Sequence, residues 1–217
     1  MYAYVVNAHR LSLWQEEVRG MPLLRVELPR RLSPRVCRRV ERWLRHAGVH
    51  ALLSCPDQWF AAPLPPLNPT RSLWREKAAE VALARLQQTG VPPSRATVEI
   101  CGDRFSAQER AVILTLLTRV RALSLSLPAP EAFLWQLQRE YGVCPLSGPG
   151  HLALCFSPAD RAQMLPLWDA RPDVPGLSLT ASLPELPPDC PRLPLLAALL
   201  EQGRIRTEEI RICTDFS

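Results

Sequence analysis

The stretch 96-ATVEICGDRFSAQERAVILTLLTRVRALSLSLPAPEAFLWQLQREYGVCPLSGPGHLALCFSP-158 decides the fold that the sequence predicts. Three short apolar runs, at residues 96–101, 122–127 and 151–156, predict strands. Two longer runs between them carry apolar residues at helical spacing and predict helices. This β-α-β-α-β order favours a parallel sheet with helices packed on it.

Both predicted helices have residues that define their ends. Ser106 and Glu109 match the S-x-x-E capping box, in which each side chain satisfies a backbone N–H group at the helix start. Pro130 suits the first turn of the second helix, and Gly142 suits its C-terminal end. We therefore expect two well-delimited helices.

Outward from this unit, the sequence predicts an α/β protein with a Rossmann-like, mostly parallel sheet and helices on both faces over residues 73–217. A smaller ββαβ segment at residues 1–60 precedes it. Residues 61–72 form the predicted linker, because their four prolines cannot join the interior of a sheet. A further helix and strand near the C-terminus predict that the sheet continues to the end of the chain.

A short pattern recurs 51 residues apart, first at Phe105–Arg110 and again at Phe156–Arg161. Each copy follows a predicted strand and predicts a helix that opens with a serine cap and an acid three residues on. Duplication of an α/β half is one interpretation. We favour convergence, because a junction between a strand and a capped helix imposes most of these residues by itself.

The composition is that of an ordinary globular protein, with 47% hydrophobic and 22% charged residues. No run approaches the roughly 18 apolar residues of a membrane span, and the N-terminus lacks the layout of a signal peptide, so we expect a cytoplasmic protein. The seven cysteines lack CxxC pairs. This spacing favours buried, reduced thiols over a disulfide framework.

The surplus of positive charge lies in the first 60 residues, which hold ten arginines and five acids. A helix is predicted from Pro34 to Ala47, capped by Ser33, with one apolar face. Its opposite face carries the partner-binding candidates Arg35, Arg38, Arg39, Arg42 and Arg45. A solvated arginine face is the simplest interpretation. The alternatives are an acidic protein partner or a nucleic-acid backbone, of which nucleic acid is not favoured, and no membrane partner is expected.

A second group of polar residues follows the central predicted strands. Ligands of open parallel sheets bind beyond the carboxyl ends of the strands. The ligand-binding candidates at these ends are Asp103, Arg104, Ser157, Asp160 and Arg161. The simpler alternative is that the aspartates cap or solvate loops and that the arginines pair with them.

No cofactor and no metal site is predicted. The chain lacks a G-x-G-x-x-G motif after any strand and lacks the G-x-x-x-x-G-K-[ST] motif of a P-loop. Cys37, His46, His50 and Cys55 are the densest potential metal ligands, but Cys37 and His46 lie on opposite sides of one predicted helix. No G-x-S-x-G motif indicates a catalytic serine.

The sequence leaves the activity undetermined, including whether the protein is an enzyme. We expect first a non-catalytic interaction or regulatory protein that uses its arginine-faced helix. The alternatives are an enzyme or small-ligand binder with a site at the ends of the central strands, and a nucleic-acid-binding protein. A Rossmann-like layout does not choose among them, because it serves many unrelated activities.

Overall fold

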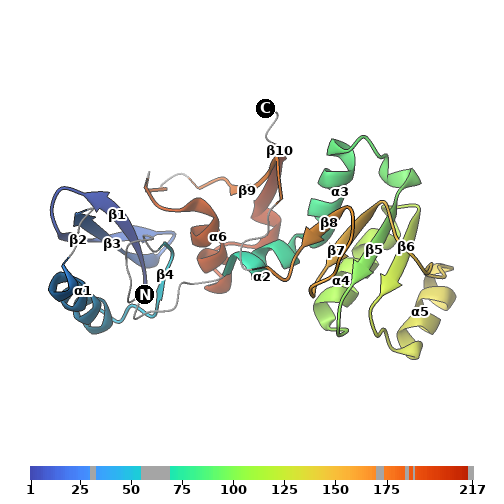
Figure 1. The fold of residues 1–217 in the computed structure, drawn as a ribbon, viewed down its shortest axis with the longest axis horizontal. Coiled ribbons are helices and arrows are strands. Elements are labelled where there is room, and N and C mark those ends of the chain that lie inside the picture. The colour runs from blue at the N-terminus through green and yellow to red at the C-terminus, as the bar shows by residue number, and fades with distance from the viewer. Residues whose placement is uncertain (30–32, 55–68, 170–173, 184–185, 188, 215–217) are drawn as a thin grey trace. The chain divides into compact units, whose positions relative to one another are not determined.

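The computed structural model describes residues 1–29, 33–54, 69–169, 174–183, 186–187 and 189–214 (Figure 1). The chain divides into two compact units. The first comprises residues 1–69 and 180–211, and the second comprises residues 70–179 and 212–217. The predicted α/β class with a parallel sheet is confirmed, and the N-terminal segment forms a mixed sheet. Residues 61–68 of the predicted linker lie outside the described residues.

The first unit is built on a four-stranded sheet of order β2-β3-β1-β4. Its strands are β1 (Tyr2–Ala8), β2 (Ser12–Val18), β3 (Met21–Pro29) and β4 (Ala51–Leu52). β1 runs parallel to β3 and β4, whereas β2 is antiparallel to β3. The ββαβ prediction lacked β2, whose exposed residues give it little alternation. Arg19 and Gly20 join β2 to β3, both with positive φ, as a two-residue hairpin turn requires.

Helices lie on both faces of this first sheet. Helix α1 (Pro34–His46) begins after Ser33, whose hydroxyl accepts a hydrogen bond from the Val36 N–H, so the predicted cap is confirmed. Its buried Val40 and Leu44 pack in one cluster with apolar residues of the sheet. On the other face, the Tyr2 hydroxyl donates to Glu201 and accepts from Gln202, at the end of helix α6 (Arg192–Glu201).

The second unit contains an all-parallel sheet of order β6-β5-β7-β8. Its strands are β5 (Thr97–Cys101), β6 (Ala122–Ser126), β7 (Leu152–Cys155) and β8 (Met164–Pro166). The three strands predicted in the middle of the chain are therefore confirmed as parallel neighbours. β5 lies between β6 and β7, so the chain moves to one side of β5 and then to the other.

The two faces of the second sheet differ in chemistry, because alternate residues of a strand point to opposite faces. One face is aliphatic and includes Val98, Ile100, Leu123 and Leu154. The other face carries Glu99, Cys101, Ser124, Ser126, Ala153 and Cys155. Loop residues that follow β7, including Ala159 and Trp168, pack on this second face.

The helices of the second unit are α2 (Pro69–Glu76), α3 (Ala78–Gln88), α4 (Ala107–Leu117) and α5 (Glu131–Tyr141). Helix α3 packs on α4 and β7, and α4 packs on β6. The capping box of Ser106 and Glu109 is confirmed, as is the end of α5 at Gly142, which has a φ of 65°. Residues 72–86 have the apolar spacing that predicts one helix, but the structure has two helices here, which meet at the buried Lys77.

The second copy of the recurring pattern does not open a helix. Residues 157–163 form bends and irregular backbone, and the chain enters β8 at Met164. The prediction of a helix here is wrong: the short segment before β8 has irregular backbone, and its Arg161 binds Glu99 of β5. Only the first copy therefore has a helix N-terminus, at α4.

The last strands do not extend the parallel sheet. β9 (Leu177–Ala181) and β10 (Ile210–Thr214) form a separate two-stranded sheet, so the prediction of a sheet continuing to the C-terminus is wrong. Short 3-10 helices, Pro93–Arg95 and Thr207–Glu209, precede β5 and β10. Among the described residues, no helix has both the length and the apolar character that crossing a bilayer requires.

Candidate functional site

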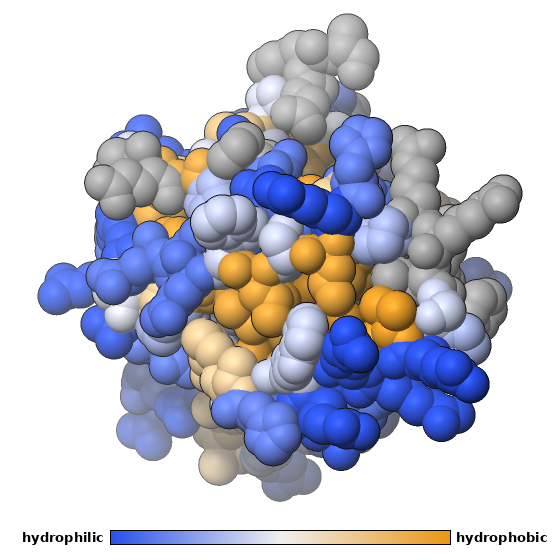
Figure 2. All heavy atoms as spheres, turned by 90° about the vertical axis from the view of Figure 1, so that its left-hand side faces the viewer, coloured by the Kyte–Doolittle hydropathy of each residue, from blue (hydrophilic) through white to orange (hydrophobic). Residues whose placement is uncertain are grey.

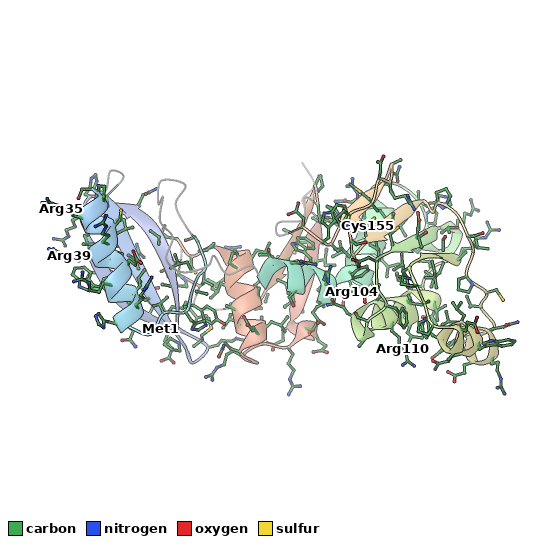
Figure 3. The ribbon with its side chains drawn as sticks, turned by 60° about the horizontal axis from the view of Figure 1, so that its bottom comes forward. Met1, Arg35, Arg39, Arg104, Arg110 and Cys155 are labelled. Atoms are coloured by element: carbon green, nitrogen blue, oxygen red, sulfur yellow. The ribbon has the colours of Figure 1, made fainter. Side chains whose placement is uncertain are left out.

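The arginine face of helix α1 is exposed along its whole length. Arg35, Arg38, Arg39, Arg42 and Arg45 are all exposed. Arg45 pairs with Glu41 at 2.8 Å, whereas the other four form no ion pair with any described residue. Figure 3 shows Arg35 and Arg39 on the outer side of α1, away from the sheet. We call these five residues the arginine face.

The electrostatics of α1 strengthen this positive surface. A helix N-terminus carries partial positive charge, which acidic residues in the first turn usually balance. The first turn of α1 contains no acid and does contain Arg35. The helix therefore adds its own positive potential to that of Arg35, Arg38, Arg39 and Arg42, which form no ion pair with a described residue.

Apolar side chains lie beside the arginine face. Trp43, on α1, is 38% exposed, and Leu13, on β2, is 36% exposed. Leu11 and Val36 are partly buried against the core of the same unit. Figure 2 shows hydrophobic surface bordered by hydrophilic side chains on the side of the molecule that Figure 1 draws at its left, where α1 lies. Mixed apolar and arginine surface is the composition of protein interfaces.

A second charged region lies at the carboxyl ends of β5 and β7. Asp103 and Arg104 follow β5 and are exposed, and Ser157 follows β7 and is half-buried. Because β5 and β7 are parallel neighbours, both loops lie at one edge of the sheet. The structure therefore brings these three candidates to the same edge, together with Asp160, which is exposed.

Arg75, which the sequence analysis did not select, belongs to this edge. Its guanidinium donates to the carbonyl oxygens of Phe156, at 2.6 Å, and Leu167, at 2.9 Å, and lies 5.4 Å from the centre of the Phe156 ring. Burial, and then repulsion from Arg71 and Arg104, lowers the pKa of Arg75. Arg75 forms no ion pair with a described carboxylate, and the charges that act on it are mixed, because Arg71 and Arg104 lower its pKa whereas Glu109 and Asp103 raise it.

Arg161 lies elsewhere, because its guanidinium turns onto the polar face of the sheet. It donates to both carboxylate oxygens of Glu99 at 2.9–3.0 Å, and it also donates to the backbone carbonyl of Asp160 at 3.0 Å. Ser126 donates to the same carboxylate at 2.7 Å. Burial raises the pKa of Glu99, but the hydrogen bonds from Arg161 and Ser126 outweigh it and hold that pKa below 4.5.

Of two hollows in the second unit, the first adjoins Glu99 and Arg161, and the second lies apart from the candidate residues. One, of about 290 Å³, is lined by Glu99, Arg161 and His151 among others. The other is an apolar groove of about 550 Å³ between the end of β6 and α5, where Trp135 is 61% exposed and Leu146 is 52% exposed. A lone acid inside the apolar run ATVEIC is the sequence signal that could have indicated Glu99, whereas nothing local indicated Arg75.

Metal ligands do not gather in the described part of the chain, which holds no group of three or more histidine, cysteine, aspartate or glutamate side chains. Cys55, one of the four densest potential ligands, lies outside the described residues.

The fold and these surfaces define an α/β protein of two units, with a basic helix face on one and a strand edge of mixed charge on the other. No protein-family model matches the chain, and no curated protein matches its sequence.

Proposed function

We propose that this is a non-catalytic interaction protein and that its arginine face binds an acidic surface of a protein partner. The observation that carries the proposal is the exposure of Arg35, Arg38, Arg39 and Arg42 without an ion pair among the described residues. Guanidinium groups bind carboxylates with two parallel hydrogen bonds, so a row of them on one helix face suits an acidic surface.

The apolar neighbours favour a protein over nucleic acid. Nucleic-acid binding depends on many cationic contacts to phosphate and needs little aliphatic surface. Here Trp43, Leu13 and Val36 lie beside the arginines on the same unit. Tryptophan and arginine are the residues most enriched among the energetically dominant contacts of protein interfaces.

The test is a double charge reversal, Arg38→Glu with Arg42→Glu, measured for binding to immobilised polyglutamate as the acidic probe. We expect about a tenfold or greater loss of affinity, because two attractive contacts become repulsive. The matched control reverses the exposed Arg119 and Arg121 of the second unit, which changes the net charge equally. We expect the control to retain affinity within about twofold, since it alters only the long-range field.

Two results would contradict the proposal. Equal losses in both double variants would mean that net charge, and not the arginine face, determines binding. Tighter binding of duplex DNA than of polyglutamate, with an affinity that falls steeply as salt rises, would favour the nucleic-acid alternative. Circular dichroism of each variant checks that α1 remains folded.

The strand edge of the second unit supports a second candidate function, the binding of a small anionic ligand. The observation that favours it is Arg75, a cation held by carbonyl oxygens next to Arg71 and Arg104. Such an edge, at the carboxyl ends of parallel strands, is where open α/β sheets bind ligands. An anion here would be attracted by the three guanidinium groups, and it would have to outweigh the repulsion from Asp103 and Glu109, whose charges also act on Arg75.

Inorganic phosphate is the probe for this second candidate, with the melting temperature as the readout. We expect phosphate to raise the melting temperature of the protein, and we expect Arg104→Ala to reduce that rise. Arg119→Ala removes an exposed arginine that does not belong to this edge. We expect this variant to retain the rise in melting temperature with phosphate. A rise of the same size in Arg104→Ala, or a rise lost in the Arg38→Glu, Arg42→Glu variant, would contradict binding at this edge.

A further inference from the structure

Two cysteines lie opposite each other where strands β5 and β7 end. Cys101 is the last residue of β5, Cys155 is the last residue of β7, and the two are register partners in the parallel pairing. Both side chains therefore project from the polar face of the sheet. Neighbouring strands lie about 4.8 Å apart, which is within the Cα separations of about 4.4–6.8 Å that disulfides span.

The two thiols are free and lie in one small cluster. Cys101 is 3% exposed and Cys155 is fully buried, and both pack with Ala153. Ala159 and Trp168 pack against this cluster from the segment that follows β7. That segment contains only the three-residue strand β8 and is held mainly by side-chain contacts, those of Arg161 with Glu99 and of Arg75 with two carbonyl oxygens, so a local opening has to break these contacts.

The surroundings make the two thiols unequal. A hydrogen bond between them is the main cause that lowers the pKa of Cys155 and raises the pKa of Cys101, and the positive charge of Arg161 also lowers the pKa of Cys155. The thiolate is the reactive form of cysteine. The Arg161 guanidinium favours a thiolate at Cys155, and Cys101, its register partner, lies where a second thiol must lie to complete a disulfide.

We propose that Cys101 and Cys155 form a modification site, at which hydrogen peroxide produces a reversible disulfide between β5 and β7. The Cys155 thiolate attacks one peroxide oxygen, the O–O bond breaks, and Cys155 becomes a sulfenic acid as hydroxide leaves. The Cys101 sulfur then attacks the Cys155 sulfur, the S–O bond breaks, and the proton of Cys101 leaves with the hydroxyl group as water. Two thiols are oxidised, and one peroxide is reduced to two molecules of water.

The geometry of the site favours reversibility. Side chains of register partners on parallel strands project side by side and do not converge, so the strand ends must shift slightly to bring the two sulfur atoms together. Disulfides formed with such strain are easily reduced. The new bond would lie beside the Glu99–Arg161 pair and before Phe156, whose carbonyl binds Arg75.

The test uses hydrogen peroxide on the full chain, followed by alkylation of free thiols under denaturing conditions, digestion with trypsin and mass spectrometry. Cleavage after arginine places Cys101 in the peptide 96–104 and Cys155 in the peptide 140–161. We expect these two peptides to appear linked, with the mass of two hydrogens lost, and to separate on treatment with dithiothreitol.

Cys144 shares the second peptide and is exposed, so Cys144→Ser is the necessary control, and we expect it to retain the link. Cys155→Ser should abolish it. Should Cys155→Ser fail to fold, the peroxide-treated original protein still decides the matter. If Cys101 and Cys155 are both found alkylated there, no disulfide has formed between them. The proposal is overturned if the peptides stay unlinked, with either thiol alkylated or oxidised to sulfinic acid, or if the link is lost in Cys144→Ser.

Discussion

Glu99 organises the polar face of the second sheet, although a single acid inside an apolar strand would ordinarily destabilise it. The side chain is 1% exposed, and its carboxylate accepts from Arg161 and Ser126. A buried carboxylate must be paired and hydrogen-bonded to offset the loss of hydration. These contacts also hold the loop after β7 on the sheet, because Arg161 belongs to that loop.

Replacing Glu99 with Gln removes the charge while retaining the shape. We expect the free energy of unfolding to fall by about 1.5–3 kcal/mol, the usual contribution of hydrogen bonds to a charged group. Urea denaturation at pH 7 measures the change. Glu208→Gln is the matched control, because Glu208 is exposed, and a loss of equal size in that variant would contradict the prediction.

The same pair predicts how stability depends on pH. The folded-state pKa of Glu99 lies below 4.5, so its contribution is fully present above the unfolded-state pKa and is lost as pH falls through the folded-state pKa. We expect the stabilities of the original protein and Glu99→Gln to converge as pH falls from about 7 to about 3. A stability difference that stays constant over this range would show that the carboxylate charge is not the cause.

Some residue roles could be predicted from sequence and others could not. The capping pair Ser106 and Glu109 was predictable, because its contacts are made three residues apart. Arg161 was predicted at the strand edge but binds Glu99, which is 62 residues away in sequence. The direction of a long side chain depends on which acid lies nearest in three dimensions, and spacing along the chain does not reveal this.

At the scale of elements, the two copies of the recurring pattern give a matched pair of serines. Ser106 caps α4 through its hydroxyl and accepts from the Gln108 N–H, whereas Ser157 precedes irregular backbone. A serine hydroxyl stabilises a helix only when helical N–H groups lie beside it. Similar local sequence therefore has different consequences in the two places.

We expect Ser106→Ala to lower the free energy of unfolding by about 1 kcal/mol, the usual value of an N-cap. Ser157→Ala should change it by less than about 0.5 kcal/mol. Thermal or urea denaturation of the two variants measures both effects side by side. An equal loss in the two variants would mean that Ser157 makes a structural contact of similar strength.

Elements with strong local signals were predicted well, and elements that depend on tertiary contacts were not. The bounds of α4, α5 and α1 follow from caps, Pro and Gly. Strand β2 was missed because five of its seven residues are polar or exposed aromatic, and it is a strand through its pairing with β3. The break at Lys77 was missed because that lysine is buried, with its ammonium on Glu80 at 2.9 Å.

At the scale of the molecule, the second unit is an almost continuous stretch, whereas the first is assembled from two distant ones. Residues 180–211 belong with residues 1–69. The Tyr2 hydroxyl binds Glu201 and Gln202, and Arg25 binds Asp189 at 3.0 Å. Sequence order hides this arrangement, because the helix and strand near the C-terminus read as one more step of the preceding α/β pattern.

This division predicts how fragments behave. We expect residues 70–179 to unfold cooperatively on their own, because this fragment contains the parallel sheet β5–β8 and the helices that pack on it. Residues 1–69 alone should not, because they lack α6 on the Tyr2 face of their sheet. Circular dichroism during heating measures both. Joining residues 1–69 to 180–211 through a Gly/Ser linker of about 15 residues should restore cooperative unfolding, and a cooperative 1–69 fragment would contradict the prediction.

The split of the first unit has a consequence for synthesis. Domains usually acquire their structure in the order in which the ribosome makes them. Here the opening strands must wait, with Tyr2, Tyr4 and Leu23 uncovered, until residues 180–211 have been translated. Residues 70–179, which form most of the second unit, are translated before residues 180–211, so the second unit can fold before the first. Nascent chains of this protein would therefore need protection of residues 1–69 until residues 180–211 have been made.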